Sequence, residues 1–254
     1  MKEIEIAFIG GSGLYKIPNF KNSKWIEVSS SFGKTSSKIC IGSLNGKNIA
    51  FLPRHGLDHN ISPSKINYRA NIEALKKINV QNIVSISAVG SLREDYKPSD
   101  FVLVDQFIDR TFLREKSFFD EDCVAHIPMA SPICENLKKI SSKALENLKL
   151  NFHSAGTYIC IEGPQFSTLA ESNLYRSWGC DIIGMTNMPE SKLAKEAGIC
   201  YVSLSMVTDY DCWHKDHDSV TVDQIVKVMK KNSDNALKFI DEICKNKSIR
   251  CSEE

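Results

Sequence analysis

The sequence predicts a single three-layer α/β domain in which helices flank a mixed central β-sheet. Short apolar segments alternate along the chain with longer segments whose apolar residues recur at helical spacing. Residues 82–88 are almost continuously apolar, as expected for a strand that is covered on both faces. The 254 residues suit one α/β domain, and no repeat, low-complexity segment or linker divides residues 1–254.

Turn and cap residues indicate the elements of the first half of the chain. Asn45 and Gly46 stand between two apolar segments and predict a type I′ hairpin turn. Ser62 can cap, and Pro63 can begin, a helix over residues 63–79. The strands predicted in this half comprise residues 4–10, 38–44, 49–53, 82–88 and 101–105.

Glycine and proline also delimit the elements of the second half. Gly179 and Gly198 each follow a predicted helix directly, where glycine commonly ends a helix. Pro189 suits the first turn of one helix, and Thr221 can cap a long final helix. The helices comprise residues 134–150, 167–178 and 189–197 and a final one with apolar residues from Val222 to Ile243, and the strands comprise residues 157–161, 182–185 and 201–207.

Composition excludes several classes of protein. The 32 Lys and Arg against 31 Asp and Glu leave a net charge of +1, so no basic excess is available to hold a nucleic-acid backbone. No apolar run approaches the roughly 18 residues of a membrane span, and the N-terminus has acids where a signal peptide has basic residues. The nine cysteines form no C-x-x-C pair, and His and Cys do not occur together at zinc-ligand spacing. We therefore expect a cytoplasmic protein with reduced thiols, no metal, and no nucleic-acid or membrane partner.

Polar or glycine-rich segments follow six of the predicted strands. In open α/β sheets, ligands bind beyond the carboxyl ends of the strands, so these segments are candidates for a site. They are GSG (11–13), RHG (54–56), SAVG (87–90), EGPQFS (162–167), MTN (185–187) and TDYD (208–211).

Four of these segments together suggest a site for inorganic phosphate. The glycines beside Ser12 let backbone N–H groups approach an anion, although an ordinary tight turn is the alternative. A dinucleotide-binding loop would need a third glycine where Lys16 stands. Arg54 is either an exposed loop residue or a phosphate ligand with two parallel hydrogen bonds. Ser87 and Thr186 add hydroxyl groups to the same predicted edge.

Asp209 and Asp211 form a candidate acid/base pair just after an apolar strand. In a dry site one carboxyl can stay protonated and donate a hydrogen bond to a departing heterocycle nitrogen. Helix capping or a solvated turn is the alternative. On residue type alone, His126 is a loop or core residue, and Phe166 and Trp213 are core residues rather than ligand contacts.

Ten motifs occur together and in order along almost the whole chain, from about Ile4 to about Ile243. They are GGSGL (10–14), PRHG (53–56), PSKINYRANI (63–72), SAVGSL (87–92), DQFIDRT (105–111), HIPMA (126–130), IEGPQFST (161–168), GMTNMPE (184–190), AKEAGICY (194–201) and TDYDCW (208–213). With these motifs the chain resembles the methylthioadenosine phosphorylase family of the trimeric purine nucleoside phosphorylase superfamily. The motifs IEGPQFST (161–168) and TDYDCW (208–213) are the most specific.

The resemblance implies a purine nucleoside phosphorylase-like fold, a homotrimer, and phosphate-dependent cleavage of an N-glycosidic bond. The substrate that it implies is S-methyl-5′-thioadenosine, which would give adenine and 5-methylthioribose 1-phosphate in purine and methionine salvage. Methylthioinosine, inosine or guanosine are the alternative substrates. The resemblance implies no metal or organic cofactor, since inorganic phosphate is a co-substrate.

The resemblance also implies roles for individual residues. Asp209 and Asp211 would be catalytic, Asp209 by donating to purine N7 and Asp211 by accepting from the 6-amino group. Phosphate would be held by Ser12, Arg54, His55, Ser87, Ala88 and Thr186. The nucleoside would contact Val89, Gly90, His126, Phe166, Ser167, the backbone of Met185, Thr186, Asp209, Asp211, Val222, Ile225 and Val226. An ionised Asp211 pairs with a 6-amino group and repels a 6-oxo group, so we expect adenine nucleosides to be preferred.

Two interpretations compete with phosphorolysis. Members of the same superfamily at large include enzymes that use water instead of phosphate, which would give hydrolysis. A nucleotide-binding module without catalysis would use the glycines of residues 10–13, although the missing third glycine argues against it.

Overall fold

The computed structural model describes all residues except 1–2, 12, 120–122, 216–221, 247 and 250–254, and of residues 222–226 it describes only the helical backbone. The strands are β1 (Ile6–Gly10), β2 (Lys21–Ile26), β3 (Ile39–Leu44), β4 (Lys47–Pro53), β5 (Asn82–Ser91), β6 (Phe101–Leu103), β7 (Gln106–Arg110), β8 (Phe152–His153), β9 (Thr157–Ile161), β10 (Ile182–Gly184) and β11 (Cys200–Tyr210). The helices are the 3₁₀ turn η1 (Pro63–Lys65), α1 (Tyr68–Lys77), α2 (Glu135–Asn147), α3 (Leu169–Ser177), α4 (Asn187–Glu196) and α5 (Val222–Ile243).

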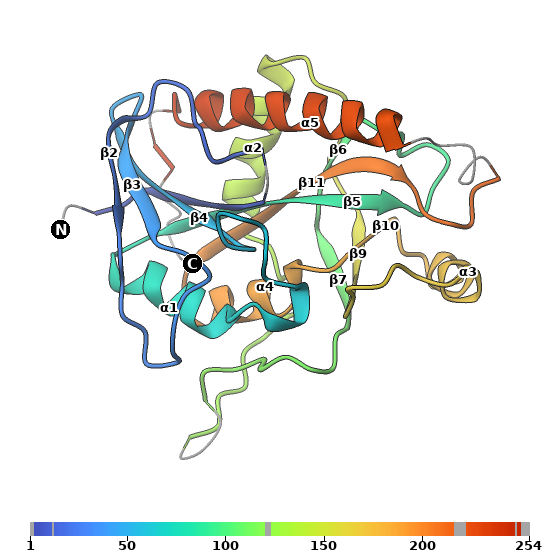
Figure 1. The fold of residues 1–254 in the computed structure, drawn as a ribbon, viewed down its shortest axis with the longest axis horizontal. Coiled ribbons are helices and arrows are strands. Elements are labelled where there is room, and N and C mark those ends of the chain that lie inside the picture. Colours follow the sequence, from blue (N-terminus) through green and yellow to red (C-terminus); the bar gives the residue numbers. More distant parts are fainter. Residues whose placement is uncertain (1–2, 12, 120–122, 216–221, 247, 250–254) are drawn as a thin grey trace.

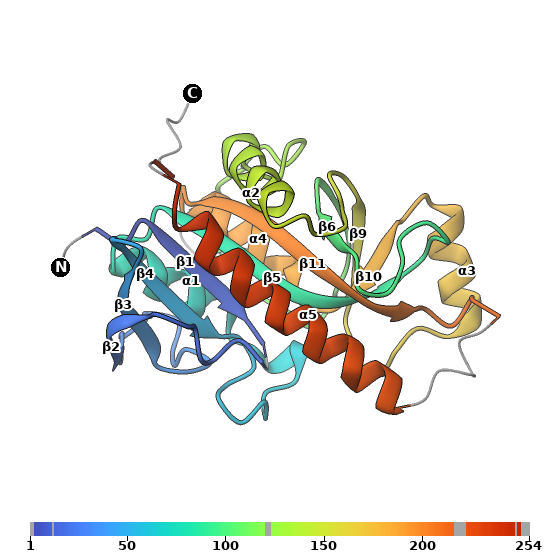
Figure 2. The same ribbon diagram turned by 90° about the horizontal axis from the view of Figure 1, so that it is seen from above.

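These strands form one mixed sheet, which confirms the predicted fold class. Its main path runs β2-β3-β4-β1-β5-β10-β9-β7, and a second branch leaves β5 through β11 to β6 and β8. Figures 1 and 2 show β5 and β11 side by side through the middle of the molecule. The central strand β5 is buried along most of its length, as its continuous apolar sequence predicts.

Helices cover both faces of the sheet, which gives the predicted three layers. The long helix α5 lies along one face, and α1 and α4 pack together on the other (Figure 1). Helix α2 contacts α5 and β11. Within the described residues, no helix is long and apolar enough to cross a bilayer.

One edge of β5 pairs with two different strands. Near its start β5 pairs in parallel with β1, up to Ile9 beside Ser85. Near its end it pairs antiparallel with β10, where Ile183 lies beside Gly90 and Ile182 beside Ser91. Residues 86–89 therefore pair with neither strand on this edge, and we call this interval the ladder gap. Because β1 and β10 run toward each other along β5, the segments that follow both strands meet at the ladder gap.

Several expected element boundaries need correction. Strands β5 and β11 continue to Ser91 and Tyr210 because they pair with each other along their whole length, with one irregularity between Val207 and Asp209. The candidate residues 87–90 and Asp209 therefore lie within strands rather than after them. The expected strand 101–105 ends early, and a separate strand, β7, pairs with β9.

Of the predicted turn and cap residues, the hairpin turn is confirmed and one helix cap is wrong. The hairpin between β3 and β4 is confirmed, with Asn45 and Gly46 both at positive φ. The cap expected at Ser62 is wrong, because its side chain makes no cap hydrogen bond and Pro63 begins only the short turn η1. Asn67 caps α1 instead, by accepting a hydrogen bond from the Ala70 N–H. The cap expected at Thr221 lies outside the described residues.

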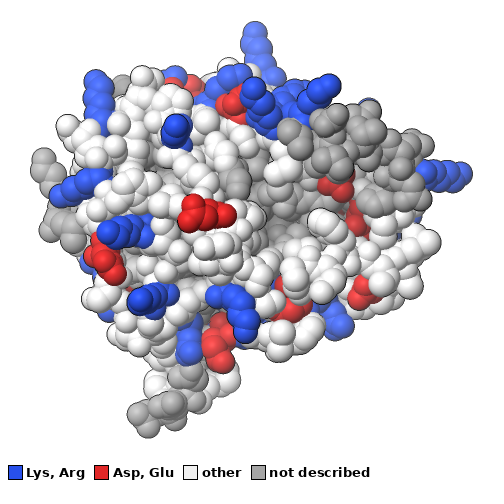
Figure 3. All heavy atoms as spheres, viewed as in Figure 1, with Lys and Arg blue, Asp and Glu red and all other residues white. Residues whose placement is uncertain are grey.

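Positive charge gathers along α5 at the top edge of the view in Figure 3, while the rest of that face mixes both signs. The exposed lysines of this helix are Lys227, Lys230, Lys231 and Lys238. The nearly neutral chain thus carries a local basic surface on one helix.

Candidate active site

The guanidinium of Arg54 lies at the start of the ladder gap, beside Ile86. Arg54 follows β4 directly, and its backbone N–H donates to the carbonyl of Gly10 at the end of β1. Its Nη1 donates to the Ile86 carbonyl at 3.2 Å, and its Nη2 donates to Ser85 Oγ at 2.6 Å. The residue is 1% exposed, so the exposed-loop alternative is wrong.

A carboxylate that sequence analysis did not single out faces Arg54. Glu190, on α4, accepts from Arg54 Nε at 2.8 Å and from Nη2 at 3.1 Å. It also accepts from the hydroxyls of Ser85 and Tyr201. Burial works against the charge of Arg54, but the Glu190 carboxylate raises the pKa of Arg54 above its usual value. The two-pronged edge of Arg54 is thus engaged with Glu190, and among the described residues only one N–H, on Nη1, is left for an anion.

Two buried hydroxyl groups near the ladder gap have no hydrogen-bond partner within the described residues. They belong to Ser87, on β5, and Thr186, which follows β10. Buried hydroxyls in native proteins are nearly always hydrogen-bonded, so these two are available to donate to a polar ligand. Hydroxyl donors beside an arginine suit an oxyanion such as phosphate. Ala88 lies between Ser87 and Val89 in the same gap.

His55, beside Arg54, is a neutral group at this end of the site. Its Nδ1 lies 2.8 Å from the Ile61 carbonyl, which can only accept, so Nδ1 carries the proton. Burial, with a contribution from the Arg54 charge, lowers the pKa of His55 to about 4. Near pH 7, His55 therefore presents an Nε2 that accepts a hydrogen bond rather than a positive charge.

The two candidate carboxylates lie together at the far end of β5. Asp209 pairs with Gly90 in the sheet, and its Oδ1 accepts from the Thr208 hydroxyl at 2.5 Å. Asp211 Oδ2 accepts from Ser167 Oγ at 2.7 Å. A Cβ added at Gly90 would lie 3.6 Å from the Asp211 Cβ, so these residues form one cluster. The helix-cap alternative for this pair is wrong, because Asp209 lies in β11 and no described helix begins at Asp211.

The two aromatic candidates, Phe166 and Trp213, differ in burial. Phe166 is 85% exposed, so the core role that its residue type indicated is wrong. Trp213 is partly buried, donates from Nε1 to the Ser91 carbonyl, and lies under the guanidinium of Arg176. Its core role is confirmed.

The backbone of Met185, which follows β10, is held by Arg114. Its carbonyl accepts from Arg114 Nη1 at 2.7 Å. Gly163 packs so closely on the Met185 side chain that an added Cβ would lie 2.5 Å from its sulfur.

Some candidate residues are not placed at this cluster. His126 is exposed in the segment between β7 and α2, and no contact among the described residues joins it to the ladder gap. Ser12 and the side chains of Val222, Ile225 and Val226 lie outside the described residues. Their roles stay predictions.

Sequence analysis gave no role to Glu190, Arg114 and Glu162. Each makes an ion pair with a partner far along the chain, and no spacing or periodicity reveals such a pair. Glu190 lies in the first turn of α4, where an acid is favoured by the helix dipole alone and so attracts no attention. Within the described residues, no group of three His, Cys, Asp or Glu side chains is arranged to hold a metal ion.

Comparison with known proteins points to one family. The family model described as "Phosphorylase superfamily" matches residues 5–245. A Rhodospirillum rubrum protein named S-methyl-5′-thioadenosine phosphorylase is 54% identical, over 92% of this chain and 80% of its own length. A protein of the same name from Thermofilum pendens is 47% identical, over 96% of this chain and 92% of its own length.

Solved structures agree with these relatives. A methylthioadenosine phosphorylase from an antarctic soil metagenomic library has a TM-score of 0.92 and 48% identity, and the match covers 96% of this chain and 86% of that one. The methylthioadenosine phosphorylase of Schistosoma mansoni in complex with tubercidin has a TM-score of 0.89 and 35% identity, with 95% and 91% covered.

Proposed function

The chain belongs to the phosphorylase superfamily, and we propose that it cleaves S-methyl-5′-thioadenosine with inorganic phosphate, giving adenine and 5-methylthioribose 1-phosphate. The observation that carries this proposal is the pair of unpaired buried hydroxyls of Ser87 and Thr186 beside Arg54 in the ladder gap. The carboxylates of Asp209 and Asp211 come from the end of β11, which lies beside the end of β5.

The spacing along β5 fits a nucleoside that reacts with phosphate. Ser87 and Gly90 are three residues apart, which is about 10 Å along a strand. A phosphate at Ser87 and a purine at Gly90 would therefore leave room for a ribose between them. Phosphate needs placement rather than activation, and its charge stabilises a ribose that becomes oxocarbenium-like as the glycosidic bond breaks.

The leaving purine needs a proton on its ring, and Asp209 is the proposed donor to N7. Asp211, fixed by the Ser167 hydroxyl, is the proposed acceptor for the 6-amino group. A 6-oxo purine would place an oxygen against that carboxylate, which is unfavourable for two buried acceptors. These roles favour adenine nucleosides over inosine and guanosine.

The 5′ group decides between two adenine nucleosides. Relatives at about half identity are named for the methylthio nucleoside, and a solved structure from Schistosoma mansoni is named adenosine/methylthioadenosine phosphorylase. We propose the methylthio nucleoside as the preferred substrate, with His126, Val222, Ile225 and Val226 around its 5′ end.

The proposed reaction requires no metal or organic cofactor, because phosphate is the nucleophile and a carboxyl supplies the proton. Activity should accordingly survive dialysis against a chelator.

We propose a homotrimer in the cytoplasm. Exposed apolar side chains of Phe112, Leu113 and Phe166 near the site support burial against another copy. The eight cysteines of the described part are unpaired, which supports a reducing compartment. Sedimentation equilibrium would test the assembly, and a monomer at micromolar concentration would contradict it.

The decisive experiment incubates the purified enzyme with methylthioadenosine, adenosine or inosine, each with and without phosphate, and separates the products. We expect phosphate-dependent release of adenine, fastest from methylthioadenosine. Release that does not need phosphate would favour hydrolysis, and preferred release of hypoxanthine would overturn the roles of Asp209 and Asp211.

A further inference from the structure

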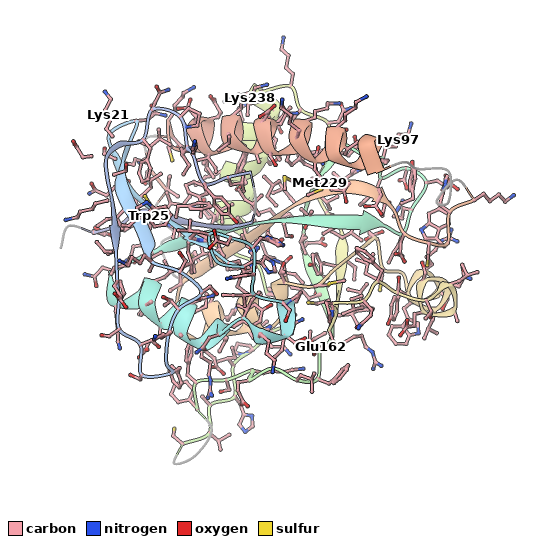
Figure 4. The ribbon with its side chains drawn as sticks, viewed as in Figure 1. Lys21, Trp25, Lys97, Glu162, Met229 and Lys238 are labelled. Atoms are coloured by element: carbon pink, nitrogen blue, oxygen red, sulfur yellow. The ribbon has the colours of Figure 1, made fainter. Side chains whose placement is uncertain are left out.

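A second buried ion pair lies beside the site and has no part in the proposed chemistry. Arg114 Nε donates to Glu162 Oε1 at 2.9 Å, and the two side chains are 1% and 6% exposed. Arg114 follows β7, and Glu162 follows β9. Figure 4 places Glu162 at the lower end of β7 and β9 in this view, on the opposite side of the sheet from Met229 of α5.

Arg114 binds backbone carbonyls on two neighbouring segments. Nη1 donates to the carbonyls of Met185 and Met188 at 2.7 and 2.6 Å. Nη2 donates to the carbonyl of Glu162 at 2.7 Å. The Tyr68 hydroxyl, from α1, is a further acceptor for Nη1 at 3.0 Å. One guanidinium thus joins the segments that follow β7, β9 and β10.

Glu162 holds Arg114 in turn and is itself surrounded by donors. Its carboxylate accepts from Ser64 Oγ at 2.5 Å and from the N–H groups of Phe112 and Leu113 at 2.6 and 3.0 Å. Burial raises the pKa of Glu162, but these donors and Arg114 lower it to about 2. A carboxylate held ionised by this many donors is not suited to exchange a proton, so its contribution is geometric.

The segment that Arg114 clamps is the one that carries Thr186. The Thr186 hydroxyl is buried with no partner among the described residues, and its N–H donates only weakly, to Tyr158 at 3.3 Å. Carbonyls on both sides of Thr186, those of Met185 and Met188, end on Arg114. Arg114 therefore holds the backbone on both sides of the Thr186 hydroxyl, while Tyr158 holds the Thr186 N–H.

We propose that Arg114, oriented by Glu162, is a positioning residue that fixes the phosphate-contacting hydroxyl of Thr186 and the sugar-contacting backbone of Met185. This inference rests on the proposed function. The fork of an arginine places two nitrogens in a fixed geometry against carbonyls of two segments, whereas a lysine offers a single nitrogen on a flexible stem.

Arg114→Lys tests the proposal while it keeps the positive charge beside Glu162. We expect kcat/KM for phosphate to fall about 10- to 100-fold, as a displacement of roughly 1 Å at a reacting group can do. Glu162→Gln, which keeps the shape but removes the charge, should change kinetics in the same direction. Arg93→Lys is the matched control, because Arg93 pairs with Asp95 and Asp181 away from the site and its replacement should leave kinetics unchanged.

Kinetics in a Thr186→Ala background separate positioning from folding. If Arg114 acts through Thr186, Arg114→Lys should change the KM for phosphate much less when Thr186 is already absent. An equal factor in both backgrounds would overturn the proposal. So would unchanged kinetics per folded molecule accompanied by a lower Tm, because the pair would then serve folding alone. If the unaltered enzyme shows no phosphorolysis, the proposed function fails first, so the two failures are distinguishable.

Discussion

A single arginine and its carboxylate partner dominate the chemistry at the phosphate end. Arg54 and Glu190 are both almost fully buried and form two hydrogen bonds to each other. The pair is electrically neutral, and His55 beside it is neutral near pH 7. Phosphate would therefore be held by one N–H of Arg54 and by hydroxyl and backbone donors, rather than by a surplus of positive charge.

Arg54→Lys should raise the KM for phosphate much more than the KM for the nucleoside. Loss of one hydrogen bond from a charged donor costs about 1.5–3 kcal/mol, so we expect an increase of roughly tenfold or more. Steady-state kinetics with each substrate varied in turn measure the two constants. Equal effects on both would show that Arg54 does not hold phosphate. Alanine is the poorer replacement, because it leaves Glu190 buried without its cation.

Asp209→Asn should lower kcat for adenine nucleosides by at least about a hundredfold, because general-acid assistance to the leaving purine is lost. The isosteric change keeps an acceptor for the Thr208 hydroxyl, so the fold should be preserved. Asp95→Asn, a surface change beside Arg93, is a suitable control. Kinetics of the Asp209 variant that match the unaltered enzyme would remove this residue from the mechanism.

At the scale of elements, the site exists because β5 changes partner. Between Ser85, the last residue beside β1, and Gly90, the first beside β10, the strand is free of ladder partners on one edge. Arg54 enters there from the end of β4, and the segments after β1 and β10 converge on the same place. Ser87 thus faces a gap that the fold leaves between two strands.

Ser87→Ala should leave the phosphate-free enzyme as stable as before, or slightly more stable. The Ser87 hydroxyl is buried without a partner among the described residues, and such a group costs about 1–3 kcal/mol. The variant should, however, show a smaller increase in Tm with phosphate, since a ligand stabilises the folded state by an amount that grows with the logarithm of its concentration relative to Kd.

Ser172→Ala is the matched control for this experiment. Ser172, on α3, also carries a buried hydroxyl with no partner in the described part of the chain, but it has no role in the proposed site. Its variant should keep the full phosphate-dependent increase in Tm. A Ser87 variant that responds to phosphate like this control would remove Ser87 from the phosphate site.

Local patterns predicted most elements but not their partners. The apolar run of 82–88 identified β5, and Asn45-Gly46 identified the hairpin, because both signals are local. Strand β2 was missed because it is an edge strand that pairs only with β3, and all but one of its residues are exposed. The change of partner along β5 depends on β1 and β10, which lie far apart in sequence, so no local pattern could predict it.

Local patterns also failed to predict those site residues whose partners lie far away in the sequence. Arg54, Ser87, Thr186 and Asp209 were found because each is a polar residue at the end of a predicted strand. In the structure Ser87 and Asp209 lie within β5 and β11, and Thr186 follows a strand antiparallel to β5. Glu190 and Arg114 were missed because their importance lies in ion pairs and carbonyl contacts that only the folded chain creates. The motifs around residues 161–168 and 208–213 added the family, which no composition or periodicity supplied.

Stability of the whole molecule should fall in acid in two separate steps. The first belongs to His55, whose pKa is lowered from 6.5 to about 4 by burial. In the unfolded chain this histidine binds a proton below pH 6.5, while in the folded protein it does so only near pH 4, so the free energy of unfolding decreases across that window. The loss reaches on the order of 3 kcal/mol at pH 4.

The second step belongs to carboxylates such as Glu162, whose pKa of about 2 lies below the ordinary value of 4.5. Its stabilisation is complete above pH 4.5 and is lost as the pH falls toward 2. Urea unfolding at pH 7, 5.5 and 4.5 isolates the first step, because Glu162 stays ionised in both states over most of that range. His55→Gln, which cannot be protonated, should flatten the decline between pH 6.5 and 4.5, whereas His126→Gln, an exposed histidine, should leave it unchanged. A His55 variant with the same decline as the unaltered protein would mean that another group binds the proton, and that His55 is charged in the folded site.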